Sequence, residues 1–211
     1  MRVLIVYAHP DPSSYVGSLR NLVRHIALGT EHELREHDLY EENFTAALSA
    51  NEWSLHYSPP EAKPHLLGHF NDLKWCDTLI FVYPTWWGGQ PAIMKAWFDR
   101  ILAHGVAWNL PEGAKRISPQ LQNVKRIVAV TTHGSSKWVN TLEGEPGKRT
   151  ITRSLRVLCS WRASVTWLAL YGVDASTRVE RDRFTRQVER RLQKILRRRV
   201  ERQPEPQATT M

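Results

Sequence analysis

Residues 77–104, DTLIFVYPTWWGGQPAIMKAWFDRILAH, decide the fold of this chain. The run from Thr78 to Tyr83 is continuously apolar, β-branched and aromatic, which is typical of a strand buried on both faces of a parallel sheet. Pro84 is expected to end this strand, and Gly88-Gly89 allow the backbone to turn sharply. From Pro91 onward apolar residues recur at helical spacing. The stretch is therefore predicted to form a central strand, a rigid loop and an amphipathic helix.

The predicted loop has the features of a ligand site. It places Thr85, Trp86 and Trp87 at the carboxyl end of the strand, where open α/β sheets bind ligands. Two adjacent tryptophans beside two glycines offer flat apolar surface next to exposed backbone N–H groups. A planar aromatic cofactor needs this combination of stacking contacts and edge hydrogen bonds. The alternative is that both tryptophans are core residues that cap the sheet.

Composition restricts the class of protein. The 211 residues, with nine tryptophans, are enough for one folded domain with a substantial core. Cys76 and Cys159 do not form a Cys-x-x-Cys pair, so neither a disulfide framework nor a metal site is indicated, and a reducing cytosol is expected. The apolar N-terminal run is too short for a signal peptide, and no stretch approaches the ~20 apolar residues of a membrane span. We therefore expect a cytoplasmic protein.

The positive charge is concentrated near the C-terminus. The formal net charge is +8, and residues 178–202 contain ten arginines and one lysine against four acidic residues. Such a run could attract nucleic acid or acidic lipid. Apolar residues at helical spacing instead favour an amphipathic helix with a solvated basic face, and these residues are Phe184, Val188, Leu192 and Ile195. A nucleic-acid partner is not expected.

The rest of the chain alternates predicted strands and helices. Further strands are predicted at residues 2–8, 32–39, 124–131 and 163–171. Helices are predicted from residue 13 or 14 to 28 and over 61–75, 147–160 and 176–200, with irregular segments at 40–60 and 105–123. Because right-handed crossovers make such a sheet parallel, we expect an α/β fold. The predicted fold is a doubly wound five-stranded parallel sheet with helices on both faces. Residues 1–202 are expected to form a single domain and residues 203–211 a disordered tail.

Three strand ends carry unusual loops, AHPDPSSY, YPTWWGGQP and TTHGSSKW. In strand order 2-1-3-4-5 they converge on one crevice at the switch point. The first loop offers hydroxyl and N–H groups at a helix start, which favours a phosphate. The second offers aromatic surface, and the third offers donors for the far edge of a ring. A flavin needs this set, whereas the fingerprints of a Rossmann dinucleotide site, a P-loop, a zinc protease and a serine hydrolase are missing from the sequence.

The segments LIVYAHPDPSSY, VYPTWWGGQPAIMKAWFDRILAHGVAW and VTTHGSS resemble the flavodoxin-like NAD(P)H:quinone oxidoreductase family, DT-diaphorase type. The resemblance covers most of residues 2–192. It implies a flavin-dependent homodimer that passes hydride from NAD(P)H to a quinone or a similar electrophilic acceptor by a ping-pong mechanism. It favours FAD, with FMN as the alternative. The residues themselves identify no adenine pocket, because Arg178 or Arg181 could hold an adenine but either is more simply a solvated side chain. The flavin-contact candidates that it implies are His9, Ser14, Tyr15, Val16, Ser18, Pro84, Thr85, Trp86, Trp87, Gly88, Thr131, Thr132, His133 and Gly134.

Three positions depart from the family pattern. Val16 stands where an asparagine is common, and His133 replaces the first glycine of the third loop. Trp138 stands roughly where the family has a tyrosine credited with charge stabilisation, and an indole cannot supply a phenolic proton. Trp138 and His133 are therefore catalytic candidates without a defined role. A flavin- or nucleotide-binding regulatory subunit of an ion-transport system is the alternative function.

The helix predicted over 91–104 has more apolar side chains than one packed face requires. These and the apolar residues of the following loop are Ile93, Met94, Trp97, Phe98, Ile101, Val106 and Trp108. Part of this set is predicted to form an exposed patch at a two-fold dimer interface, with the flavin edge facing the partner. The alternative is that the segment 40–60, with Phe44 and Trp53, covers the patch within one chain.

Overall fold

Five parallel strands form the main sheet of the computed structural model, which describes residues 1–29 and 32–197. The order β2-β1-β3-β6-β7 confirms the predicted 2-1-3-4-5 topology. The strands are β1 (Arg2–Tyr7), β2 (Glu33–Asp38), β3 (Thr78–Thr85), β6 (Arg126–His133) and β7 (Ser164–Tyr171). From the central pair β1 and β3 the chain winds outward in both directions, so the switch point lies between these two strands.

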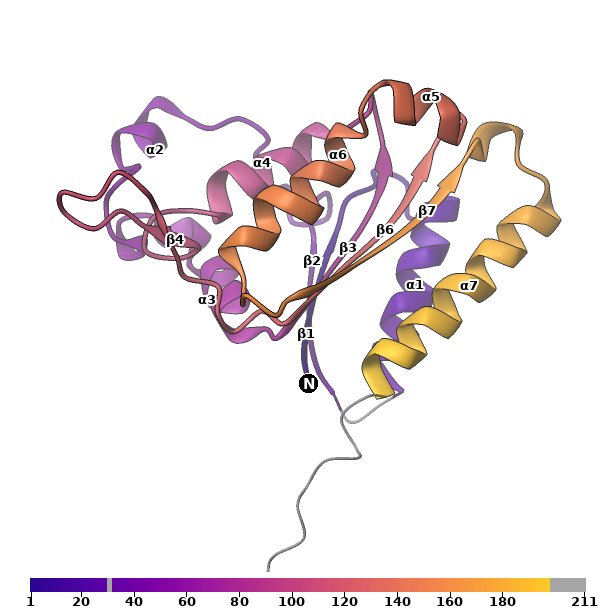
Figure 1. Ribbon diagram of the computed structural model, residues 1–211, viewed down its shortest axis with the longest axis horizontal. Coiled ribbons are helices and arrows are strands. Elements are labelled where there is room, and N and C mark those ends of the chain that lie inside the picture. Colours follow the sequence, from indigo (N-terminus) through magenta and orange to yellow (C-terminus); the bar gives the residue numbers. More distant parts are fainter. Residues whose placement is uncertain (30–31, 198–211) are drawn as a thin grey trace, which may run out of the picture.

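Helices cover both faces of the sheet (Figure 1). On one face lie α1 (Tyr15–Leu28) and α7 (Arg178–Arg197). On the other lie α3 (Leu67–Trp75), α4 (Ala92–Ile101) and a helical run that begins with α6 (Pro146–Arg149) and continues as a π-helical stretch and a 3-10 turn to Leu158. Alternate residues of each central strand enter the two cores, because successive strand side chains point to opposite faces. No helix within the described residues is long and apolar enough to cross a membrane.

The prediction for the basic helix is confirmed over its described part. Phe184, Val188 and Leu192 are buried between α7 and the sheet, and Ile195 packs against the same core. Most of the basic side chains of α7 lie on its exposed face. The predicted end of this helix at residue 200 and the predicted disordered tail 203–211 lie outside the described residues.

Several short elements were not predicted. Helix α2 (Ala50–Ser54) interrupts the segment expected to be irregular, and α5 (Lys137–Leu142) follows the third loop. Two 3-10 turns, Pro60–Ala62 and Pro64–Leu66, precede α3. A two-stranded antiparallel ribbon of β4 (Trp108–Asn109) and β5 (Ser118–Pro119) lies in the predicted 105–123 loop. Each of these elements is too short for hydrophobic periodicity to reveal it.

Strand β3 does not end at Pro84, as the sequence predicted, but continues to Thr85. The Val82 carbonyl accepts a hydrogen bond from the Ala8 N–H, so the backbone N–H and C=O of residue 82 face β1. Residue 84 faces the same side by strand alternation, and β1 has already ended there. The missing N–H of proline therefore leaves no ladder partner unsatisfied. Pairing with β3 and β7 likewise extends β6 two residues beyond the predicted end, to His133.

The prediction of an exposed apolar patch on α4 is wrong. Trp97 is inaccessible to solvent, and Ile93, Met94, Phe98, Ile101 and Val106 are also buried. Phe44 packs into the same core, as the alternative proposed, whereas Trp53 remains exposed. The segment that precedes α3 therefore covers this helix within one chain.

A buried ion pair attaches the covering segment to α4. Arg100 donates from Nε and Nη2 to Oε1 of Glu52, at 2.9 and 2.7 Å, and from Nη1 to the Thr45 carbonyl. Both charged side chains are almost fully buried. Burial opposes ionisation of Glu52, but hydrogen bonds from the Ser49 N–H, His65 and Arg100 lower the pKa of this carboxyl to about 2. Because both charges are buried, loss of either partner would leave the other charge buried without its ion-pair partner.

Candidate functional site

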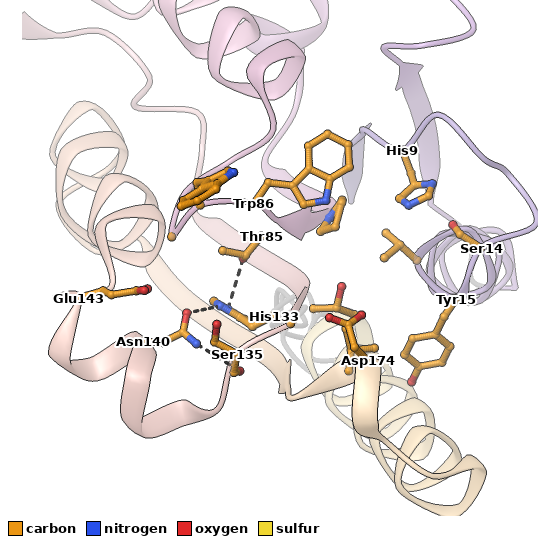
Figure 2. A pocket seen from close by; sticks show the side chains of 17 residues that line it. His9, Ser14, Tyr15, Thr85, Trp86, His133, Ser135, Asn140, Glu143 and Asp174 are labelled. Atoms are coloured by element: carbon orange, nitrogen blue, oxygen red, sulfur yellow. Dashed lines mark hydrogen bonds between the residues drawn. The ribbon is translucent and has the colours of Figure 1, made fainter.

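A cavity of about 750 Å³ opens at the carboxyl edge of the sheet (Figure 2). Its size is within the range of small-molecule and cofactor sites. The loops after β1, β3, β6 and β7 contribute to its wall. The lining residues are His9, Ser14, Tyr15, Val16, Pro84, Thr85, Trp86, Trp87, Gly88, Thr132, His133, Gly134, Ser135, Asn140, Glu143, Val173 and Asp174.

The first loop brings the N-terminus of α1 to the cavity. Ser14 is the N-cap residue, and its hydroxyl accepts a hydrogen bond from the Gly17 N–H at 3.0 Å. A Cβ at Gly17 would lie 2.2 Å from the Pro12 carbonyl oxygen, so only glycine lets the loop fold this closely onto the helix. Tyr15 donates its hydroxyl to the Arg181 carbonyl at 2.8 Å and thereby ties α1 to α7. This helix end, with its N–H groups and positive dipole, is suited to an anion.

The second loop is a tight two-residue turn. Trp86 and Gly89 exchange both backbone hydrogen bonds at 3.0 Å, and the central residues Trp87 and Gly88 have φ of 49° and 72°. Two positive φ values define a type I′ turn, in which a tryptophan is strained. The sequence predicted the sharp turn but assigned it to Gly88-Gly89 and not to Trp87-Gly88. The Trp87 side chain is fully exposed, and the Trp86 indole lies beside the His9 ring with 6.4 Å between ring centroids.

The third loop carries a buried histidine. The His133 ring stacks on Tyr171 with 4.5 Å between centroids. Its Nδ1 lies 2.7 Å from Oδ1 of Asn140, and its Nε2 lies 3.3 Å from Oγ1 of Thr85. Burial lowers the pKa of His133 below the ordinary histidine value, although Asn140 and nearby acidic groups oppose this shift. We therefore treat His133 as neutral at pH 7.

The structure brings most of the predicted site residues to one cavity, and three of them lie outside its lining. Ser18 is exposed on α1, where its hydroxyl bonds to the Ser14 carbonyl. Thr131 is buried, with its hydroxyl 2.9 Å from that of Thr85. Trp138 is exposed on α5 and does not line the cavity. Whether the lining residues contact a flavin stays a prediction.

Five lining residues were not among the predicted site residues, and they are Ser135, Asn140, Glu143, Val173 and Asp174. Ser135 belongs to the third loop that the sequence marked. Asn140 and Glu143 are placed by the unpredicted α5 and the turn after it. Val173 and Asp174 follow β7, so the shared carboxyl edge of parallel strands was a signal that could have found them.

A second cluster of polar residues lies away from the cavity. His37, Glu42 and His69 place ligand-type atoms within 4.8 Å of one another. The Trp97 indole donates its N–H to Nδ1 of His69 at 3.3 Å. Since an indole can only donate, Nδ1 carries no proton and the neutral ring is protonated at Nε2, the nitrogen nearest Glu42. In this arrangement Nε2 of His69 has no lone pair for a metal ion.

The two arginines considered for an adenine do not line the cavity. Arg178 is exposed at the start of α7. Arg181 is half-buried and donates to the Ser176 carbonyl at 3.1 Å. The geometry of these two side chains therefore does not separate FAD from FMN.

The chain resembles known proteins in sequence and in fold. The family described as having a flavodoxin-like fold matches residues 1–196, and this chain belongs to it. The chain is 30% identical over 162 residues to the rat protein named NAD(P)H dehydrogenase [quinone] 1, covering 69% of this chain and 58% of the relative. It is 33% identical over 153 residues to ribosyldihydronicotinamide dehydrogenase [quinone] of Pongo abelii, covering 64% of this chain and 65% of the relative. The matched part is thus less than two thirds of each relative's length.

Solved structures agree on the fold. The Streptococcus mutans protein Smu.1420 superposes with a TM-score of 0.78 at 25% identity, covering 92% of this chain and all of that one. The NAD(P)H:quinone oxidoreductase of Methanothermobacter marburgensis gives 0.74 at 24% identity, covering 92% and 98%. The family resemblance inferred from the loop motifs is confirmed by these matches.

Proposed function

We propose that this chain is a flavoenzyme that passes hydride from NAD(P)H through a bound flavin to a quinone or a similar electrophilic acceptor. One observation carries the proposal. A helix N-terminus, two adjacent indoles and the bare backbone at Gly134 meet at one cavity beside the switch point. The names of the rat and Pongo abelii relatives, both quinone-linked dehydrogenases, support the same reaction class.

The residues present fit a flavin. The first turn of α1 offers N–H groups to a phosphate, and Gly17 lets the preceding loop fold closely onto this helix end. Trp86 offers an apolar face for stacking, and Thr85, Thr132 and Gly134 offer polar groups to the ring edge. When bound, the flavin supplies the two-electron chemistry, accepting a hydride and passing it on. The loops after β1, β3 and β6 would hold the ring. FAD is the cofactor that the resemblance favours, with FMN as the alternative.

We further propose that the enzyme acts as a homodimer with the cavity facing the partner. The patch on α4 does not support this, because it is buried. The support is the exposed apolar surface that Trp86 and Trp87 present at the cavity. Trp138 and Leu142 are also exposed, on α5, the helix that carries the lining residue Asn140. Exposed apolar groups clustered beside a site commonly mark an interface. Light scattering that reports a monomer at micromolar concentration, together with full reductase activity, would refute this assembly.

The two buried free cysteines fit the reducing cytoplasm in which we place the protein.

The test is an absorbance spectrum followed by an activity assay. The protein should show flavin bands as purified or after reconstitution with FAD or FMN, and mass spectrometry of the cofactor released from the purified protein identifies which flavin it binds. Quinone-dependent NADPH oxidation should then follow. Bound flavin without any such turnover would instead favour the regulatory subunit.

A matched pair of variants tests the site itself. Trp86→Ala should weaken flavin binding about tenfold, since a stacking contact is lost. Trp161→Ala removes an exposed tryptophan that does not line the cavity and should leave binding unchanged. Equal affinities in both variants would show that the second loop does not hold the ring.

A further inference from the structure

We propose that His133 is a positioning residue that fixes the direction of the Thr85 hydroxyl, so that Thr85 faces the cavity as a hydrogen-bond acceptor. The inference rests on the proposed function only in taking a flavin as the ligand. It concerns a position at which this chain departs from the pattern of the family it resembles, because His133 stands where a glycine is usual. A chain of hydrogen bonds crosses β3, β6 and α5. Figure 2 shows its bonds from Thr85 to His133 and from His133 to Asn140, and Thr131 on β6 extends it beyond Thr85.

Asn140 determines which nitrogen of His133 carries the proton. Nδ2 of Asn140 lies 3.3 Å from the Ser135 carbonyl and 2.8 Å from the Ser136 carbonyl. Carbonyl oxygens only accept, so this end of the amide is the NH₂ group and Oδ1 faces His133. An amide oxygen also only accepts, and the 2.7 Å contact therefore requires a proton on Nδ1 of His133.

The neutral ring then determines the direction of the two threonine hydroxyls. With its proton on Nδ1, His133 has a lone pair on Nε2, and the Thr85 hydroxyl donates to it. Since the Thr85 proton is used in this way, the Thr131 hydroxyl at 2.9 Å donates to Oγ1 of Thr85. The Thr132 carbonyl, 3.5 Å from the Thr131 hydroxyl, is the longer and weaker of its two acceptors. The bonds thus run in one direction, from Thr131 through Thr85 and His133 to Asn140.

One acceptor position of Thr85 remains. A hydroxyl oxygen has two lone pairs, of which Thr131 uses one. Thr85 lines the cavity, and no other donor bonded to its hydroxyl oxygen is found among residues 1–29 and 32–197. The site therefore favours a planar ligand that presents an N–H at this point of its edge, such as a ring N–H of an oxidised flavin.

Protonation of His133 would reverse this preference. Nε2 and Thr131 would then both donate to Oγ1 of Thr85, so the Thr85 proton would turn towards the cavity. The titratable and charged groups around the ring are Glu143, Glu145 and Lys148 beyond α5, Tyr171 on β7 and Asp174 after it. The two glutamates favour the charged ring and Lys148 opposes it, while burial, the largest effect, keeps the pKa below the ordinary value. Affinity for a ligand that donates should therefore fall only as the pH drops below the ordinary histidine range.

The first test is the protonation state of His133 in the protein without flavin. ¹⁵N NMR of histidine-labelled protein, assigned by the loss of one spin system in His133→Gln, reports the tautomer directly. We expect a neutral ring with the proton on Nδ1 at pH 7. His25→Gln, which removes an exposed histidine of α1, is the control for assignment. A charged ring, or a proton on Nε2, would overturn the proposal whether or not the protein binds flavin.

The second test separates positioning from simple packing. In His133→Asn the amide can still reach Asn140 but not Thr85, whereas in His133→Gln it reaches the Nε2 position and can accept from Thr85. We expect His133→Asn to weaken flavin binding about three- to tenfold at pH 7, as for one lost hydrogen bond, and His133→Gln to stay near the parent. The loss of affinity at low pH should vanish in His133→Gln. Equal losses in both variants, or none in either, would overturn the proposal, and a parent that binds no flavin would instead refute the proposed function.

Discussion

Two pairs of adjacent aromatic residues, only ten positions apart, lie in opposite environments. Trp97 and Phe98 on α4 are 0% and 5% exposed, whereas Trp86 and Trp87 in the preceding loop are 42% and 104% exposed. Composition does not distinguish the two pairs. The difference lies in what the rings contact. Trp97 and Phe98 pack against Phe81 of β3, and Trp97 also donates to His69 of α3, whereas no described segment closes over the loop. Exposed indoles on a strained turn at a cavity are thus the feature that indicates binding, and the buried pair indicates packing.

Truncation of one tryptophan in each pair should give the largest difference in the free energy of unfolding. Trp97→Ala removes a side chain with no solvent exposure and should cost about 3–5 kcal/mol in the free energy of unfolding. Trp87→Ala should change that free energy by less than about 0.5 kcal/mol, because its side chain has no packing to lose. Urea denaturation measures both values. Similar losses would mean that the two pairs do not differ as described.

The attachment of the covering segment to α4 can be weakened without changing the aromatic residues of α4. Arg100→Met leaves Glu52 buried without its cation and should destabilise the protein by about 3 kcal/mol. The exposed pair Lys95–Asp99 on the same helix is the control, and Lys95→Met should cost less than about 1 kcal/mol. An Arg100 variant as stable as the Lys95 variant would mean that the ion pair does not anchor the segment.

The same ion pair should make stability depend on pH. The pKa of Glu52 in the folded chain is about 2, below its ordinary value near 4.5. The stabilisation is therefore present above pH 4.5 and is lost as the pH falls towards 2, because protons then bind first to the unfolded chain. Denaturation midpoints between pH 6 and 3 should fall less in Glu52→Gln than in the parent. Parallel pH profiles would contradict this assignment.

The smallest expected effect concerns the strained turn. Trp87→Gly places a residue without a Cβ at a φ of 49° and should raise the unfolding free energy by up to about 1 kcal/mol. The same change removes an exposed indole at the cavity and should weaken flavin binding. Thermal unfolding and flavin titration of one variant therefore move in opposite directions. A variant that is both less stable and equally able to bind flavin would remove Trp87 from the proposed site.

The sequence predicted the sheet because its central strands are long apolar runs, and it predicted the strand order from crossover rules. It located the cavity because three unusual loops follow strands that end at one edge. It did not predict α5, whose six residues, KWVNTL, show no clear periodicity, and so it missed Asn140. It misjudged α4 because the covering segment also lacks periodicity, and the Glu52–Arg100 pair that attaches it joins residues 48 positions apart. Such contacts depend on tertiary packing, which local patterns do not encode.

The unequal lengths of the central strands have a consequence for the rigidity of the cavity floor. Because β1 stops at Tyr7 while β3, β6 and β7 run on, the edge of the sheet is stepped, and the ligand would lie over the ends of the three longer strands. These strand ends consist of paired backbone from Thr85 across His133 to Tyr171. In amide hydrogen exchange, protection should therefore extend to the floor on the β6 side and end at Ala8 on the β1 side. Changes to the surrounding loops would then alter which acceptor enters the cavity, while the paired backbone of β3, β6 and β7 stays in place.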